Sequence, residues 1–327
     1  MLVSASRNIE GAGNRMGFQG IRWPVARFQF DFEVTASIHL PHYGGSTIRG
    51  SFGRALRRTC CMTRMKKCLG CPLFRGCPYT SIFESPASVC QTSLSMGKVP
   101  NPYVVEAPEY GERIYAPGEH LVFEVVLIGR AIEKLPIVIY AFQQAFARDV
   151  GYGKAKLCSV SAENPESGCF DVIYTGSGNV AYSGFRGFEL LPMGDEVSIH
   201  IRTPLRLQNN GHILGSAEFS SYSFFISLLR RVSLLFVSQV KWSEEGFLQI
   251  LIDEIKNVSV ESDLKRVGFI RYSSRQKQKM NLDGVVGEAH FKNISPDLQI
   301  LLRLGTWLHV GKNATFGLGR YSIEADN

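Results

Sequence analysis

The segment LHVGKNATFGLGRY (Leu308–Tyr321) places a glycine-rich loop between an apolar run at 298–308 and a strand-like run at 320–323. Glycines allow positive φ angles and let the backbone approach a ligand closely. Successive backbone N–H groups in such a loop form an anion-binding concavity, to which Lys312 and Arg320 add positive charge. The loop therefore indicates contact with phosphate groups and favours a nucleic-acid ligand. Its glycines are Gly311, Gly317 and Gly319.

The elements around this loop occur twice along the chain, in the same order. The first copy has strands and helices at 28–40, 47–58, 121–128, 136–148 and 154–160. The second copy has them at 196–207, from Ser220 onward, near 264–272, and at 284–291, 295–308 and 320–323. The second copy reads as β-α-β-β-α-β with a glycine loop before its last strand, which is the ferredoxin-like pattern, and we assign the same pattern to the first copy. The sequence thus predicts an α+β protein with two tandem ferredoxin-like domains, at 21–190 and 191–327.

The N-terminal region and the longest apolar stretch both argue against membrane insertion. Residues 1–20 lack the apolar core of a signal peptide, which predicts a flexible N-terminal extension. The apolar stretch at 220–240 carries Arg230 and Arg231 at its centre and therefore favours a buried helix over a membrane span. We expect a cytoplasmic protein with no membrane partner.

The composition favours a folded protein with a polyanionic partner. Of the 327 residues, 45% are hydrophobic, which is enough for a core and excludes global disorder. The formal net charge of +7 and the pI near 9.0 favour a polyanion such as nucleic acid, although charge alone does not identify it.

The cysteines are concentrated in one short segment at 60–77. Cys68 and Cys71 form a C-x-x-C pair, and Cys77 with either Cys61 or Cys60 completes a set of four thiolates. In a cytoplasmic chain such clustering favours a metal over disulfides. We expect a closed structural zinc site in a small cysteine-rich insert at about 60–90, with an iron–sulfur cluster, free thiols or a disulfide as the alternatives. Four thiolates leave no open coordination position, so no catalytic metal is expected.

Two basic clusters indicate RNA. Residues 265–282 hold six cations and no acid, and Phe269 and Tyr272 stand among them. Aromatic stacking combined with phosphate contacts suits single-stranded or hairpin RNA, and a hairpin edge protected by charge is the alternative. On the first helix, Arg54 and Arg58 share a face. With the glycine loop, the residues expected to contact RNA are Arg49, Arg54, Arg58, Arg271, Arg275, Lys277, Lys279, Gly311, Gly317, Gly319 and Arg320.

Several of these segments resemble one known family. The matching C-terminal segments are RYSSRQ (271–276), LDGVVG (282–287) and 309–321. They resemble the CRISPR-associated RAMP endoribonuclease family that processes precursor CRISPR RNA, the Cas-six family. The helix at 45–58, the cysteine cluster and NPYV (101–104) are similar to a subgroup with a cysteine insert. The resemblance extends from about 28 to 323 and implies the RRM-like ferredoxin domains of RAMP proteins.

The resemblance implies an activity and partners. A member of this family cleaves CRISPR repeat RNA to mature crRNA without a metal ion, by attack of a ribose 2′-hydroxyl on the adjacent phosphate. The products carry a 2′,3′-cyclic phosphate and a 5′-hydroxyl, and the enzyme stays bound to the crRNA hairpin. The alternative is a non-cleaving RNA-binding RAMP subunit, with other subunits of a CRISPR effector complex as partners.

The implied chemistry needs a base, an acid and a cation to steady the phosphorane. The family usually places a histidine in or just before the first helix, but the segment 47–58 contains none. The candidates are His42, in the turn before this helix, and His309, beside the glycine loop. We expect Lys312 to stabilise the phosphorane and Tyr43 to orient the attacking hydroxyl.

Overall fold

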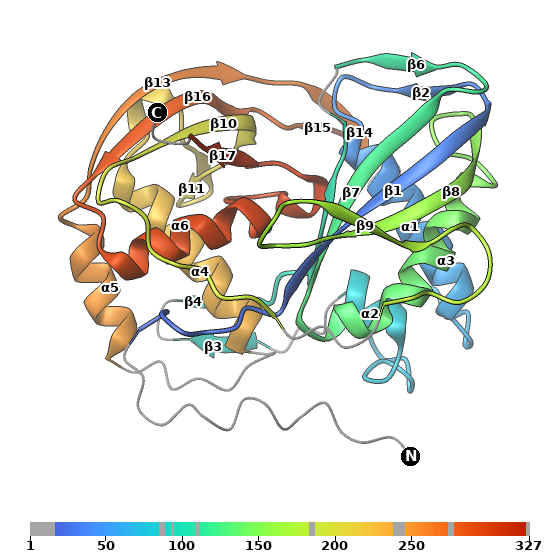
Figure 1. Cartoon of the computed structure of the whole chain (residues 1–327), viewed down its shortest axis with the longest axis horizontal. Helices are drawn as coiled ribbons and strands as arrows, with labels where there is room; N and C mark the ends of the chain where they lie inside the picture. The colour runs from blue at the N-terminus through green and yellow to red at the C-terminus, as the bar shows by residue number, and fades with distance from the viewer. Residues whose placement is uncertain are drawn as a thin grey trace.

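The computed structural model describes residues 17–84, 89–92, 95–108, 111–182, 187–237, 246–273 and 278–324. For residues 89–92, 95–98, 237, 270–273 and 278–280 it describes the backbone only. The described chain forms two lobes that lie side by side, each built of a β-sheet with helices packed on it (Figure 1). Among the described residues, we find no helix with the length and apolar character that crossing a membrane requires.

The first domain contains a sheet in the order β5-β7-β1-β8-β9, with every neighbouring pair antiparallel. Its strands are β1 (Val25–Ala36), β5 (Tyr103–Glu106), β7 (His120–Ile128), β8 (Lys154–Glu163) and β9 (Phe170–Tyr174). Its helices are α1 (Gly45–Cys60), α2 (Pro78–Phe83) and α3 (Leu135–Phe146). The first four strands therefore have the order of a ferredoxin-like domain, and β9 extends one edge.

Alternation along β1 explains why α1 and α3 cover one face of this sheet. Its sequence VARFQFDFEVTA places Phe28, Phe30 and Phe32 on one side with no exposed surface, whereas the residues between them are polar. Phe30 packs on Phe142 of α3 with ring centroids 5.0 Å apart, and Phe32 stacks on the α3 residue Phe146 at 4.1 Å. Aromatic burial of this kind provides the core of the first domain.

The second domain repeats this topology with its sheet in the order β13-β16-β10-β17. Its strands are β10 (Val197–Leu205), β13 (Ser259–Val267), β16 (Gly284–Lys292) and β17 (Tyr321–Ile323). Its helices are α4 (Ser221–Val237), α5 (Phe247–Ile255) and α6 (Pro296–Leu308), and α4 packs on the sheet through Phe224, Phe225 and Phe291. The prediction of two tandem ferredoxin-like domains is confirmed.

Four two-stranded sheets and three short 3-10 turns accompany the two main sheets among the described residues. The pairs are β2 (Ile38–Leu40) with β6 (Arg113–Tyr115), β3 (Val89–Thr92) with β4 (Ser95–Lys98), β11 (Gln208–Asn209) with β12 (His212–Ile213), and β14 (Ile270–Ser273) with β15 (Gln278–Asn281). The 3-10 turns are η1 (Gly129–Lys134), η2 (Ser216–Glu218) and η3 (Ala314–Phe316). The β14–β15 hairpin lies where the second domain meets β2 and β6 of the first (Figure 1).

The two domains are packed against each other through apolar side chains, and this domain interface is called the joint below. Val104, Val126 and Ile128 of the first sheet belong to the core cluster of the second domain. Phe18 also belongs to this cluster, with no exposed surface and with its N–H 2.6 Å from the Asp297 carboxylate. The sequence predicts a flexible extension at residues 1–20, but Phe18 is packed in the core. Residues 1–16 lie outside the described residues.

Candidate nucleic-acid interface

The structure buries His309, one of the two predicted catalytic histidines. The residue follows α6 with φ +59°, and its N–H donates to the Gly305 carbonyl oxygen over 2.8 Å. The side chain has no exposed surface, and its Nε2 lies 2.7 Å from Oε1 of Glu106 in the first domain. A shielded imidazole does not reach an RNA hydroxyl, so this position corrects the predicted role of His309 as a general base.

Glu106 is the centre of a buried ion network between the domains. Arg27 donates from Nε and Nη2 to its two carboxylate oxygens, over 2.8 and 3.3 Å, and Nε of Arg320 lies 3.9 Å away. Burial alone would raise the pKa of Glu106, but the charge of Arg27, the His309 hydrogen bond and Arg320 hold it well below its usual range. Burial lowers the pKa of His309, against the opposing effect of Glu106. The network thus keeps a carboxylate charged in the joint.

The glycine loop uses many of its N–H groups inside the protein. Those of Lys312 and Gly319 donate to the carbonyl oxygens of Arg206 and Pro204, over 2.9 and 3.1 Å. The N–H of Gly317 donates to Ala314 over 2.8 Å. These groups are not free to hold a phosphate, so the anion concavity expected from the sequence does not form through them.

The loop glycines instead permit close backbone contact at positive φ. A Cβ on Gly319 would lie 1.9 Å from the Val310 carbonyl oxygen. On Gly317 it would lie 2.5 Å from the carbonyl oxygen of Val105, a residue of β5 in the first domain. On Gly311 it would lie 2.6 Å from the Arg206 carbonyl oxygen. The glycines thus fasten the loop to the second domain and to the first.

His42 lies exposed where the two domains meet. It stands in the turn between β2 and α1, and its ring centroid is 6.4 Å from that of Phe269, which precedes β14 in the second domain. The neighbouring Tyr43 stacks on Phe269 at 5.2 Å and donates its hydroxyl to the Phe316 carbonyl oxygen over 2.5 Å. Tyr43 therefore anchors the glycine loop beside His42, which leaves the imidazole accessible from solvent.

Two predicted cations of the glycine loop differ in their surroundings. Lys312 is exposed, as the role of a phosphate-binding cation requires. Arg320 is partly buried, with Nη2 3.4 Å from a carboxylate oxygen of Glu124 in the first domain. Arg320 therefore serves the joint and also borders the groove between the domains.

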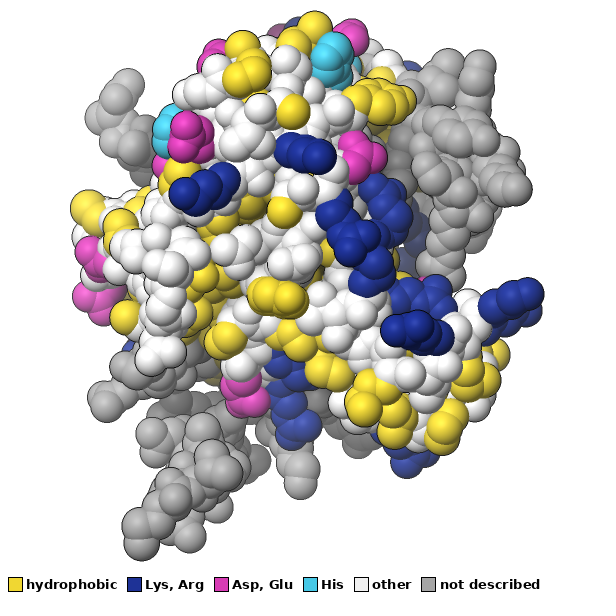
Figure 2. Space-filling model, turned by 90° about the vertical axis from the view of Figure 1, so that its right-hand side faces the viewer, with side chains coloured by type: hydrophobic (Ala, Val, Ile, Leu, Met, Phe, Trp, Pro, Cys, Tyr) yellow, Lys and Arg dark blue, Asp and Glu magenta, His cyan; other side chains and the backbone are white. Residues whose placement is uncertain are grey.

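The basic residues of α1 separate into two groups. Arg54 and Arg58 are exposed, and burial followed by the charges of Arg148 and Arg54 lowers the pKa of Arg58, which shows that the three guanidinium groups are close. Figure 2 shows Lys and Arg side chains gathered in a band on the side of the molecule where α1 and α3 lie. Arg49 instead packs over the rings of Phe83 and Phe316, at 4.3 and 4.7 Å, and stabilises the joint.

The basic segment between β13 and β16 is described only in part. Arg271 lies in β14 and Lys279 in β15, where the backbone alone is described, and the prediction that their side chains contact RNA stays a prediction. Arg275 and Lys277 lie outside the described residues.

A groove of about 600 Å³ lies between the domains and adds basic residues that sequence reasoning missed. It is bordered by Arg27, Arg202, Arg303 and Arg320, with Trp307 among them. Arg320 was already expected from the glycine loop, but Arg27, Arg202 and Arg303 are far apart in the sequence and no local pattern identifies them. Arg27 lies over the buried ring of Trp307 at 4.4 Å and pairs with Glu106 and Glu163 at 2.8 Å, so it supports the groove from inside. Arg202 is exposed and Arg303 is partly exposed, and such guanidinium groups suit contact with a nucleic-acid backbone.

The predicted metal ligands lie together on the first domain. Cys60, Cys61, Cys68, Cys71 and Cys77 all border one pocket of about 320 Å³, between the end of α1 and the start of α2. Each of them is a free cysteine in the structure. Their sulfur atoms do not form a compact ligand shell, because no three of them among the described residues lie within 4.8 Å of one another.

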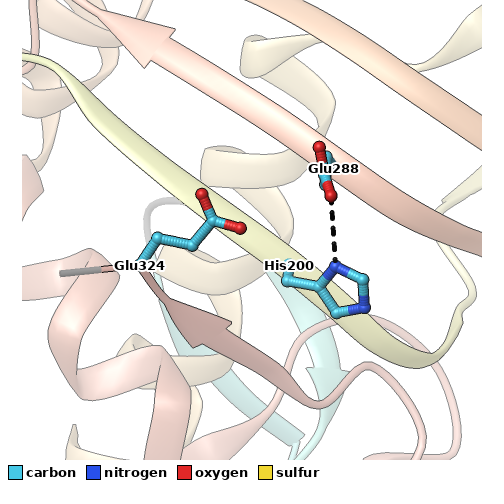
Figure 3. Close-up of side chains that lie close together, drawn as sticks. All are labelled: His200, Glu288 and Glu324. Atoms are coloured by element: carbon cyan, nitrogen blue, oxygen red, sulfur yellow. Dashed lines mark ion pairs between the residues drawn. The ribbon is translucent and has the colours of Figure 1, made fainter. Parts of the chain in front are cut away.

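A second set of potential ligands lies on the surface of the second domain. His200 of β10, Glu288 of β16 and Glu324 after β17 bring their ligand atoms within 4.8 Å of one another (Figure 3). Nδ1 of His200 is 3.8 Å from Oε1 of Glu288, and all three side chains are exposed. Exposed groups of this kind form ion pairs in water without a metal, and we assign no site to them.

Comparison with known families gives two matches that divide the chain as the domains do. Residues 23–184 match a family model described as an N-terminal domain. Residues 199–321 match the model of the CRISPR-associated endoribonuclease Cas6. No curated protein matches the chain.

Solved structures share the fold along nearly the whole chain. A Cas6 (TTHB231) product complex superposes with a TM-score of 0.57 at 13% identity, over 92% of this chain and 100% of that chain. Thermus thermophilus Cas6 (TTHB231) gives 0.52 at 11% identity, over 93% and 100%. A partial Cas6-RT-Cas1–Cas2 complex gives 0.52 at 13% identity, over 94% of this chain and 47% of that chain. At these identities the likeness establishes the shared two-domain fold.

Proposed function

Because residues 199–321 match the model of the CRISPR-associated endoribonuclease Cas6, we propose that the protein is an endoribonuclease that cleaves CRISPR repeat RNA. The observation that carries this proposal is the position of His42. This exposed histidine stands at the junction of the two domains, beside a loop of the Cas6-type domain that Tyr43 anchors. An accessible imidazole at such a junction suits proton transfer to or from an RNA substrate held by both domains.

The proposed reaction is an in-line attack of a ribose 2′-hydroxyl on the adjacent phosphate, in which the chain's own residues supply the catalysis. His42 takes the 2′ proton or protonates the leaving 5′ oxygen. Lys312, exposed on the glycine loop, steadies the charge on the phosphorane. Tyr43 acts by positioning this loop, since its hydroxyl already donates to Phe316. The products then carry a 2′,3′-cyclic phosphate and a 5′-hydroxyl.

The basic surfaces support retention of the cleaved RNA. Arg54, Arg58 and Arg148 offer exposed charge on one side, and the groove bordered by Arg202 and Arg303 offers it between the domains. Because each phosphate contact releases a counterion, such surfaces hold RNA strongly at low salt. A non-cleaving RNA-binding RAMP subunit is the second candidate, favoured by the burial of His309, which leaves fewer exposed groups for proton transfer.

The test uses purified protein in EDTA with a labelled repeat RNA from the CRISPR array of the same genome. A second copy of this RNA carries a 2′-deoxy substitution at the cleavage site. We expect cleavage of the ribose form alone. Cleavage that requires added metal would contradict the proposed mechanism, and tight binding without cleavage of either form would favour the non-cleaving subunit.

Two histidine variants locate the reacting group. We expect His42→Ala to lower the single-turnover cleavage rate by a factor of about 100 or more, with little change in RNA affinity. His212→Ala is the matched control, because His212 is 65% exposed in the second domain and contacts Glu218. An unchanged rate in His42→Ala would remove His42 from the mechanism.

A further inference from the structure

The segment between α1 and α2 shows a reversed pattern of burial. Its large apolar side chains point outward: Met62 is 84% exposed and Leu69 is 81% exposed. Its cysteines are half-buried and face a common pocket. A short segment that leaves its apolar groups in water has no hydrophobic core to order it, and small units of this kind are usually held by disulfides or a metal.

The backbone around the C-x-x-C pair is folded as a tight turn. The N–H of Cys71 donates to the Cys68 carbonyl oxygen over 3.0 Å, and the N–H of Phe74 donates to the Cys71 carbonyl oxygen over 3.0 Å. Gly70 has φ +86° with open space around its Cα. The turn places both sulfur atoms at the pocket that Cys77 also borders, so residues from three points of the chain converge there.

Basic side chains dominate the chain around this pocket, and the carboxylate of Glu84 interacts with Cys68. From Cys60 to Tyr79 the chain contains no acidic residue, and Arg64, Lys66, Lys67 and Arg75 are exposed. Four thiolates and one divalent cation carry a net charge of −2, which these basic side chains offset. Arg57 of α1 also donates to the Met65 and Lys66 carbonyl oxygens, over 2.5 and 3.0 Å, and fastens the segment.

Two adjacent cysteines at the end of α1 are alternative candidates for the fourth ligand position. Cys60 is the last residue of the helix and Cys61 follows it. Burial, followed by the neighbouring Cys77 and Cys61, raises the pKa of Cys60 to about 11, so both of these thiols lie near Cys60. Rotation of side chains is still required to bring four sulfur atoms to zinc-binding distance, about 2.3 Å from the ion.

We propose that Cys68, Cys71 and Cys77, with either Cys61 or Cys60, bind one zinc ion in a closed structural site. The site links the end of α1 to the start of α2 and orders the basic segment between them. Four thiolates leave no position for water or substrate, so the ion stabilises the fold and takes no part in RNA cleavage.

The test measures the metal content of the full-length protein purified without added metal or chelator. We expect close to one zinc per chain by plasma mass spectrometry, and loss of most of it in Cys68→Ser/Cys71→Ser. Cys169→Ser is the matched control, because Cys169 is exposed and distant from the pocket in sequence, and it should keep its zinc. Separate Cys60→Ser and Cys61→Ser variants identify the fourth ligand as the one whose loss lowers the zinc content.

A measurement on the unaltered protein guards against variants that fail to fold. Cobalt(II) added after removal of zinc should give the intense visible and near-ultraviolet absorption of tetrahedral thiolate coordination. Iron with inorganic sulfide, disulfides found after alkylation, or zinc content equal in the double variant and in Cys169→Ser would each overturn the proposal. None of these readouts involves RNA, so they do not depend on the proposed nuclease activity.

Discussion

Nε2 of His309 lies 2.7 Å from Oε1 of Glu106, and this buried contact joins the end of α6 to the edge strand β5 of the other domain. Arg27 binds both oxygens of the same carboxylate and also donates to the Thr306 carbonyl oxygen over 3.1 Å. The histidine in the glycine motif is therefore part of the scaffold that fixes the angle between the domains. Any RNA that spans both domains depends on this angle.

The first prediction concerns the free energy of unfolding. Glu106→Gln keeps the shape of the side chain but removes the negative charge that balances the buried guanidinium of Arg27. Removal of one partner from a buried ion pair costs about 3–5 kcal/mol. We expect a loss near 3 kcal/mol in urea titration, because Arg27 retains Glu163 at 2.8 Å. The matched control is Glu33→Gln on exposed surface of β1, for which a loss above about 0.5 kcal/mol would be unexpected.

The second prediction concerns how the free energy of unfolding changes at acidic pH. The pKa of Glu106 is held well below its ordinary value of 4.5 in the folded protein. The unfolded chain therefore binds more protons as the pH falls through 4.5, and the contribution of Glu106 to stability is full above this pH and declines below it. The stability gap between the unaltered protein and Glu106→Gln should shrink as urea titrations are moved from neutral pH to below 4.5. A constant gap would show that Glu106 is not the titrating group.

The third prediction concerns the glycine loop. Gly319→Ala places a Cβ 1.9 Å from the Val310 carbonyl oxygen, at a position with φ +70°. Both the clash and the left-handed backbone oppose the substitution, and we expect a loss of about 2–3 kcal/mol, measured by thermal and urea unfolding. Gly50→Ala in α1 is the control, because its Cβ meets only the end of Arg54 at 3.8 Å. This control should gain roughly 0.5–1 kcal/mol.

The sequence predicts the fold better than the site because local patterns determine the strands and helices. The repeated order of strand-like and helical runs, with a glycine loop before the last strand of each half, was sufficient to identify both ferredoxin-like domains. The sequence does not predict the strand β5, because YVVE is buried throughout and shows no alternation. It does not predict the helix α5 either, because FLQILIDEI is short. Neither element has a distinctive end signal.

The site depends on contacts between residues that are far apart in the chain. Nothing near His309 in the sequence reveals that it faces Glu106, 203 residues away. For the same reason the glycine pattern predicts a phosphate-binding loop, whereas in the structure Gly317 packs against Val105 of the first domain. The cysteines, by contrast, are close in sequence, and the structure also brings them to a single pocket.

The last prediction concerns the groove between the domains, where Arg202 and Arg303 border a cavity beside Trp307. If both guanidinium groups contact phosphates, neutralising them removes up to two counterions from the binding reaction. We expect Arg202→Gln/Arg303→Gln to bind repeat RNA more weakly and to reduce the slope of log Kd against log salt by about 0.7–0.9 per contact. Because phosphate contacts carry no sequence information, affinity for an unrelated single-stranded RNA should fall by a similar factor. Lys256→Gln is the matched control, since Lys256 pairs with Asp253 at 2.6 Å at the end of α5 and does not border the groove. Equal slopes for the double variant and for this control would place the RNA elsewhere on the molecule, with the exposed arginines of α1 as the next surface to test.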